Sequence, residues 1–179
     1  MPIASTDIVY RLSVLTGTAG DTTAGTPAGS LGKYVSTTVV SATALNNLFD
    51  DVTGDENAAS DVEYRLLFVL NNHATLTLLA PVVWLSAEVA GGAVAAISVD
   101  TTATSAKGAT AAQAKEVANE NTAPATQTFT APTTKATGLA IGDLLPGQVR
   151  GIWVRRTAGN TAALDNDSVT LRVEGDTAA

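Results

Sequence analysis

Large apolar residues gather most densely in residues 61–89, and their spacing predicts strands. From residue 62 to residue 70 the side chains alternate between two sets. The first set is apolar or aromatic throughout and comprises Val62, Tyr64, Leu66, Phe68 and Leu70. The second set begins polar and becomes apolar, in the order Glu63, Arg65, Leu67 and Val69. Because successive strand side chains point to opposite faces, this period of two predicts a strand that enters the interior from a wetter end.

A turn is expected directly after this strand. Residues 71–73 are Asn-Asn-His, which tolerate tight turns, and the alternation resumes over residues 74–80. The pattern predicts a β-hairpin at the centre of a sheet. The residues expected to form the core are Leu66, Phe68, Leu76, Leu78, Trp84 and Trp153.

Shorter alternating segments predict the remaining strands. They are residues 8–15, 33–40, 82–88, 93–100 and 126–130. Residues 148–156 and 169–173, joined by a polar loop, predict a second hairpin at the C-terminal end. Pro81 is expected to end the strand before it, or to confine that strand to an edge or a bulge.

One segment has helical spacing. In residues 41–51, Leu45, Leu48 and Phe49 fall three and four positions apart, and Ser41 or Thr43 can cap the first turn. A run of short strands with a single short helix predicts an all-β fold, an antiparallel β-sandwich. We expect one domain over residues 1–179.

Two long segments lack large apolar side chains. Residues 16–32 are rich in Gly, Thr and Ala, and residues 101–121 are rich in Ala and Thr. Such segments bury too little apolar surface to offset the entropy of ordering. We expect extended arms that gain their order from another subunit or partner.

Composition narrows the range of partners. The net charge is −7 with only ten Lys and Arg residues, which disfavours binding to a phosphate backbone. The chain has no cysteine, so thiol nucleophiles and thiolate metal sites are excluded. The N-terminal residues do not resemble a signal peptide, and no apolar stretch is long enough to span a bilayer. We expect neither nucleic acid nor membrane as a partner, and synthesis in the cytoplasm.

No set of residues predicts catalysis or a cofactor. His73 is the single histidine, lies in a predicted turn, and is best explained as a solvated residue or one bonded to a neighbouring loop. The glycine-rich segment is not a P-loop, because Gly32-Lys33 is followed by tyrosine. The three arginines Arg150, Arg155 and Arg156 are interpreted as a solvated strand face, although they could pair with acids on a partner.

Acidic residues cluster in residues 50–57 and again in residues 165–167. Neither cluster has EF-hand spacing, and turn chemistry explains both. Incidental calcium binding at residues 50–57 stays open as an alternative. No metal site is predicted.

Several segments taken together resemble the small structural proteins of tailed-bacteriophage virions. They are GTPAGSLGKYVSTT, LNNLFDDVTGDENAASDVEYRLLFVLNNHATLTL, APVVWLSAEVAGGA, LPGQVRGIWVRRTAGNTAA and VTLRVEGDTA. The resemblance implies a sandwich of immunoglobulin or related type that assembles on a head or tail lattice. It carries no residue-level binding motif.

This resemblance sets the functional expectation. We expect a non-enzymatic virion protein, made in the host cytoplasm, that binds the major capsid protein or other virion proteins, forms a homo-oligomer and decorates the head. The alternatives are a tail tube or baseplate subunit and a surface-displayed module that binds carbohydrate or the host. Trp84 and Trp153 lie in apolar segments, which counts against a carbohydrate platform.

Overall fold

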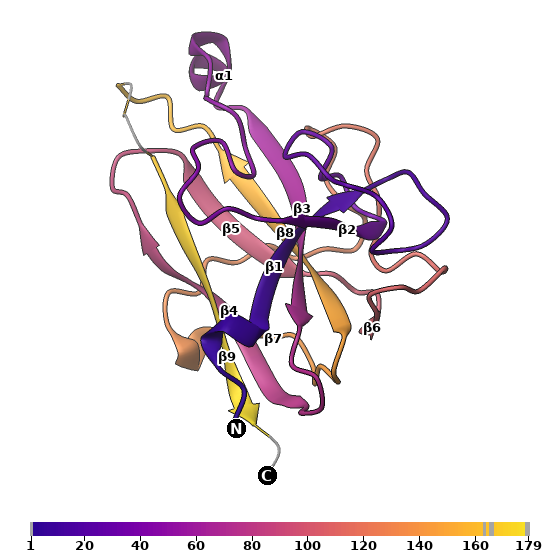
Figure 1. Cartoon of the computed structure of the whole chain (residues 1–179). Coiled ribbons are helices and arrows are strands. Elements are labelled where there is room, and N and C mark those ends of the chain that lie inside the picture. Colours follow the sequence, from indigo (N-terminus) through magenta and orange to yellow (C-terminus); the bar gives the residue numbers. More distant parts are fainter. Residues whose placement is uncertain (1, 163, 165–166, 178–179) are drawn as a thin grey trace.

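Two antiparallel sheets pack together in the computed structural model, which describes residues 2–162, 164 and 167–177 (Figure 1). The large sheet has the strand order β2-β1-β3-β8-β5, with β6 also paired to β8, and the small sheet has the order β7-β4-β9. The strands are β1 (Ile8–Val14), β2 (Tyr34–Val39), β3 (Val62–Asn71), β4 (Leu78–Glu88), β5 (Val94–Val99), β6 (Ser105–Ala106), β7 (Leu139–Ala140), β8 (Gln148–Thr157) and β9 (Val169–Thr177). The helices are α1 (Gly54–Ala59) and two 3-10 turns, Ser5–Asp7 and Lys135–Thr137. The predicted all-β sandwich is confirmed.

Strand β3 lies at the centre of the large sheet, between β1 and β8. The two sets of alternating side chains reach two separate cores. Leu67 and Val69 pack with residues of the small sheet, including Val83 and Val173. Because both faces are covered, almost every side chain of β3 is buried, including the polar ones near its start.

The other face of β3 is covered by loops and not by a second sheet. Leu66 and Phe68 are fully buried there with Val149 and Trp153, beneath Ala114 and Val117. We call this covering the loop layer and define it as residues 16–33 and 101–132. In Figure 1 it lies at the right, beside β2 and β6. The molecule therefore has three layers, with the large sheet in the middle.

The predicted central hairpin is wrong. β3 and β4 belong to different sheets, so residues 72–77 cross from one sheet to the other. Leu76 lies in this crossover and is only half-buried, while Leu78 at the start of β4 is buried. Asn71, fully buried, fixes the crossover by donating from its side-chain amide to the carbonyls of Leu76 and Leu144, at 2.9 and 2.8 Å.

The predicted C-terminal hairpin is wrong for the same reason. β8 pairs with β3 and β5 in the large sheet, whereas β9 pairs with β4 in the small sheet. Thr157 therefore ends a strand of the large sheet, and Val169 begins a strand of the small sheet. An alternating pattern fixes which side chains of a strand face the core. It does not fix which sheet the strand joins, because the two sheets share one core and either sheet would bury the same side chains.

Pro81 sits at a bulge inside a continuous strand, which is one of the outcomes the sequence allowed. The pairing of β4 with β9 shifts between Leu79 and Val82, and Ala80 has a φ of +44°. Pro81 has no N–H to donate, so the bulge accommodates it without loss of a ladder bond. Opposite the bulge, a side chain at Gly175 would collide with the backbone of Leu79 and Pro81.

The helix predicted over residues 41–51 does not form; that segment makes irregular turns. The α-helix begins later, at Gly54, where Thr53 is the N-cap. The Thr53 hydroxyl accepts from the Glu56 N–H and the Glu56 carboxylate accepts from the Thr53 N–H, at 3.3 and 2.7 Å. This reciprocal capping box was present in the sequence as Thr-Gly-Asp-Glu and is a stronger signal than the spacing of three apolar residues.

Candidate functional site

The loop layer is held against the large sheet by buried polar side chains. Asp100, at the end of β5, is fully buried. Its Oδ2 accepts from the indole N–H of Trp153 at 2.7 Å and from the backbone N–H of Lys115 at 3.1 Å. Its Oδ1 accepts from the N–H of Thr102 at 2.8 Å. One carboxylate therefore ties the loop after β5 to the interior of the large sheet.

Gln113 is the second buried anchor, with an exposed fraction of 1%. Its side-chain oxygen accepts from the N–H of Val35 in β2 at 2.8 Å, and its amide donates to the carbonyl of Ala106 at 2.7 Å. A side chain at Gly20 would collide with Gln113 and with the backbone of Lys107, so the two segments of the loop layer fit closely here.

Backbone hydrogen bonds join the two segments directly. The N–H of Gly20 donates to Ala109 at 3.0 Å, and Lys33 exchanges bonds with the stretch around Lys115. An ion-pair group adds to this, because Asp21 binds both Arg11 of β1 and Lys107, the latter at 3.2 Å. Residues 16–32 and 101–121 have little regular structure, as expected. Both segments make many contacts with their own chain, and further ordering by another subunit stays a prediction.

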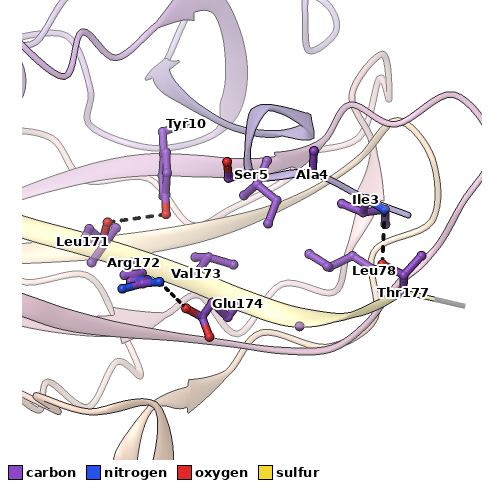
Figure 2. Close-up of a pocket in the computed structure, with 12 residues that line it drawn as sticks. Ile3, Ala4, Ser5, Tyr10, Leu78, Leu171, Arg172, Val173, Glu174 and Thr177 are labelled. Atoms are coloured by element: carbon purple, nitrogen blue, oxygen red, sulfur yellow. Dashed lines mark hydrogen bonds and ion pairs between the residues drawn. The ribbon is translucent and has the colours of Figure 1, made fainter. Parts of the chain in front are cut away.

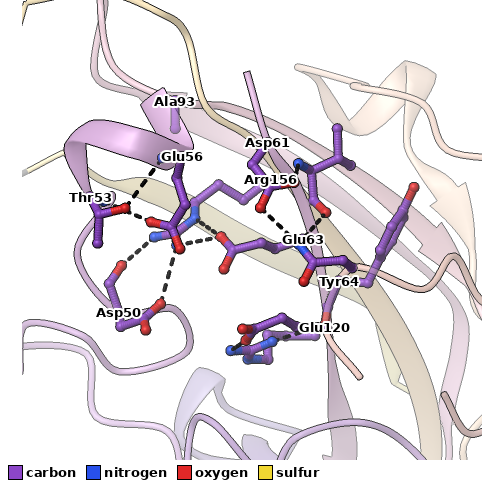
Figure 3. Close-up of polar contacts among 12 residues, drawn as sticks. Asp50, Thr53, Glu56, Asp61, Glu63, Tyr64, Ala93, Glu120 and Arg156 are labelled. Atoms are coloured by element: carbon purple, nitrogen blue, oxygen red, sulfur yellow. Dashed lines mark hydrogen bonds and ion pairs between the residues drawn. The ribbon is translucent and has the colours of Figure 1, made fainter. Parts of the chain in front are cut away.

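A second polar cluster lies near the start of β3 and includes Asp50, Glu63 and Arg156 (Figure 3). The Arg156 guanidinium pairs with Glu63 on the neighbouring strand and with Asp50, and its centre lies 4.8 Å from the Phe49 ring. Arg65 pairs with Glu120 and lies 5.6 Å from the same ring. Two cations thus contact Phe49, and these contacts hold the Phe49–Asp50 end of the segment 41–51 against the large sheet.

Glu63 is almost completely buried in this cluster. Burial raises the pKa of its carboxyl, and the hydrogen bond and charge of Arg156 oppose that rise. A buried carboxylate beside one arginine is a structural ion pair, which costs much free energy if one partner is removed.

The predicted solvated face of Arg150, Arg155 and Arg156 is therefore wrong for Arg156, which is enclosed by ion pairs. Burial also lowers the pKa of Arg150, against the raising effect of the Asp100 charge. Arg155 lies over the Phe129 ring at 5.6 Å. All three arginines lie on β8, next to the central strand β3, and Arg156 ties β8 to Asp50 and Glu63.

Other residues singled out in the sequence have local roles. His73 accepts at Nδ1 from the N–H groups of Thr75 and Leu76, at 3.2 and 3.0 Å, which is the turn role expected of it. Trp153 is fully buried, and its indole N–H donates to Asp100. Trp84 is 6% exposed and is covered by Arg172, whose guanidinium lies 5.8 Å from the ring.

The acidic segments are also accounted for by local contacts. Asp50 binds Arg156, and Glu56 caps α1. Asp165 and Asn166 lie outside the described residues, while Asp167 accepts from the N–H of Ala93 at 2.6 Å. Within residues 2–162, 164 and 167–177, no three His, Cys, Asp or Glu side chains are grouped so as to hold a metal ion.

A groove of about 380 Å³ runs along β9, between that strand and the N-terminal segment (Figure 2). Its lining includes Ile3, Tyr10, Leu171 and Val173. The Tyr10 hydroxyl donates to the Leu171 carbonyl at 3.5 Å and also contacts the backbone of Val173. Burial raises the pKa of Tyr10 to about 12. Its polar lining includes Ser5 and the ion pair of Arg172 with Glu174, whose nitrogen and oxygen are 2.6 Å apart.

No family model, curated protein or solved structure matches this chain. In the part of the chain that the structure describes, no helix is long and apolar enough to cross a membrane.

The sequence missed the groups that build the loop layer. Asp100 had a signal in the sequence, because an aspartate at the end of a predicted strand is typical of a turn. In such a turn its side chain accepts from the N–H of the second residue after it, here Thr102. Gln113 had none: its partners, Val35 and Ala106, come from separate segments and meet only in the folded chain.

Proposed function

We propose that this protein is a non-enzymatic structural protein that docks on a repeating protein surface, as a decoration protein of a tailed-phage head. The carrying observation is the loop layer, a wide surface of irregular backbone fixed from beneath by Asp100 and Gln113. The resemblance of the sequence to virion structural proteins supplies the class of partner, the major capsid protein.

The chemistry of the loop layer suits docking to a fixed partner. Its exposed side chains are mostly Ala, Thr and Gly, among them Ala111, Ala112 and Thr122. Alanine and glycine have no side-chain rotamers to lose, and the backbone is already anchored. Binding then costs little ordering entropy, which preserves affinity for small contacts repeated over a lattice.

The carbohydrate-binding alternative loses its best candidates, because both tryptophans are buried. A tail tube or baseplate subunit uses the same kind of protein–protein contact, and location on the particle distinguishes it from a head protein.

The test is to purify particles, locate the protein by antibody labelling, and compare particles with and without it during heating. Decoration predicts label on the head, and heads that lose their genome at lower temperature when the protein is absent. Label confined to the tail would instead support a tail tube or baseplate subunit. A protein found only free in the lysate would refute both the head and the tail assignment.

A matched pair of variants tests the docking face. Ala112→Arg places a large cation on the loop layer and should abolish rebinding to stripped particles. Ala87→Arg makes the same change on β4 of the small sheet, where the residue is also exposed, and should leave rebinding unchanged. Equal effects of the two variants would contradict the assignment of the face.

A further inference from the structure

The strand edges of this sandwich are protected unequally. The outer edge of β2 is covered by the loop layer, since the Asp21 N–H donates to Val35 at 2.8 Å and the Thr37 N–H donates to Thr23 at 2.9 Å. The outer edge of β5 is covered at Ile97, which exchanges two backbone bonds with Thr130. The long strand β9 pairs on one side only, with β4.

The direction of the peptide groups of β9 follows from its contacts. The Thr170 carbonyl accepts from the side-chain hydroxyl of Ser86 in β4, so the peptide group of this even-numbered residue points to β4. The Leu171 carbonyl and the Val173 backbone instead meet the Tyr10 hydroxyl. Peptide groups alternate along a strand, so the odd-numbered residues of β9 present their N–H and C=O groups to the open edge.

Tyr10 covers this edge weakly. Its bond to Leu171 is 3.5 Å long, at the limit of a hydrogen bond, and one hydroxyl cannot satisfy a nine-residue edge. Across the described residues, no backbone group of another segment bonds to the outward peptide groups of β9. An edge of this length is a template for another strand.

We propose that the occupant of this edge is the β9 strand of a second copy, paired antiparallel about a two-fold axis at Val173. Val173 is the middle residue of β9, so this register overlaps the whole strand. The N–H and C=O groups of Val173 point to the open edge, so Val173 of each copy exchanges two backbone hydrogen bonds with Val173 of the other. Leu171 pairs in the same way with Gly175 of the second copy. The two small sheets become one continuous sheet.

Charge on the solvent face selects this register. With the axis at Val173, Arg172 of each copy lies opposite Glu174 of the other, which gives two opposite-charge pairs. An axis at residue 172 places two arginines opposite each other, and an axis at 174 places two glutamates opposite each other. An axis at 175 sets Glu174 against Asp176 twice. Like charges directly opposite destabilise a strand pair, so the central register is favoured.

The same charges favour a second copy over an unrelated strand. Within one chain, Arg172 and Glu174 already form an ion pair at 2.6 Å, and Arg172 is well exposed. A positive and a negative charge two residues apart are complementary to their own antiparallel image, so a second copy supplies a matching strand. The inference is independent of the proposed function, because it concerns the opposite sheet from the loop layer.

Charge reversal tests the register. Arg172→Glu sets two glutamates of one copy against two of the other, and Glu174→Arg does the same with arginines. Each single variant should be monomeric in sedimentation velocity at concentrations where the wild type is a dimer. Mixed together, the two variants should form a heterodimer, because every cross-strand pair is then of opposite charge.

Lys135→Glu is the matched control. Lys135 contacts Glu174 at 3.4 Å from outside β9, so this variant changes net charge by the same amount as Arg172→Glu without altering the strand. It should remain a dimer, and all variants should keep wild-type circular dichroism. A monomeric wild type, dimeric single variants, or variants that fail to combine on mixing would each overturn the proposal.

Discussion

Removing the Asp100 carboxylate should release the loop layer from the large sheet. Asp100→Ala leaves three N–H groups without their acceptor, those of Trp153, Lys115 and Thr102. The indole group is fully buried, so its loss falls at the upper end of about 1–3 kcal/mol for an unsatisfied buried donor. The two loop N–H groups gain access to water once the side chain is gone. We expect a total loss of about 3–5 kcal/mol in the free energy of unfolding.

Asparagine at the same position gives a graded comparison. Asp100→Asn keeps the shape and one acceptor oxygen, so it retains the bonds to Trp153 and Lys115 and turns its amide toward the Thr102 N–H. The expected loss is about 1–2 kcal/mol. Asp143→Ala is the control, because Asp143 is exposed and accepts one bond, from the Ala80 N–H at 2.7 Å. It should cost less than about 1 kcal/mol.

Urea unfolding followed by far-ultraviolet circular dichroism measures these losses, since Trp153 fluorescence itself changes with the mutation. A double-mutant cycle of Asp100→Ala with Trp153→Phe should give a coupling energy of about 1.5–3 kcal/mol. Hydrogen exchange locates the effect: protection should fall in residues 101–117 and persist in β3 and β8.

Two results would refute the account. Fast exchange throughout residues 101–121 in the wild type would mean that the loop layer is not anchored by its own chain. A loss below about 1 kcal/mol in Asp100→Ala, with unchanged exchange, would mean that the three bonds do not carry its order.

Three further predictions concern the cores and the buried charges. Phe68→Ala should cost about 3–5 kcal/mol in urea unfolding, because Phe68 is fully buried between the large sheet and the loop layer; a loss under about 1 kcal/mol would contradict that packing. Stability should fall as the pH rises from 10 toward 12, by up to about 2.7 kcal/mol, because the unfolded chain ionises Tyr10 at its ordinary pKa of 10.0 while burial raises the folded pKa to about 12; Tyr10→Phe should abolish this contribution, and an unchanged high-pH profile in that variant would refute it. Arg156→Met should lower the free energy of unfolding by about 3 kcal/mol at neutral pH, because it leaves the buried Glu63 charge without its partner. The loss should be smaller in acid, where the raised pKa of Glu63 lets the carboxyl take up a proton. Thermal melts across pH, with Glu63→Gln as the reference, measure this, and a loss that does not change with pH would contradict the ion pair.

Local pattern was sufficient to find most strands and the two faces of β3. The alternation in residues 62–70 separated Leu66 and Phe68 from Leu67 and Val69, and these pairs do reach different cores. The period of two is a property of the extended backbone, so it survives whatever the strand pairs with. The Thr53 capping box was likewise available in the sequence, because both its partners lie within one helical turn.

Tertiary structure alone decided which strands pair and what orders the loops. A turn such as residues 71–73 can close a hairpin or lead into a crossover, and the choice rests on contacts with distant strands. The segments 16–32 and 101–121 hold too few apolar side chains to order themselves. They are fixed because Asp100 and Gln113 meet donors from elsewhere in the chain, and a buried hydrogen bond between distant segments leaves no periodic trace in the sequence.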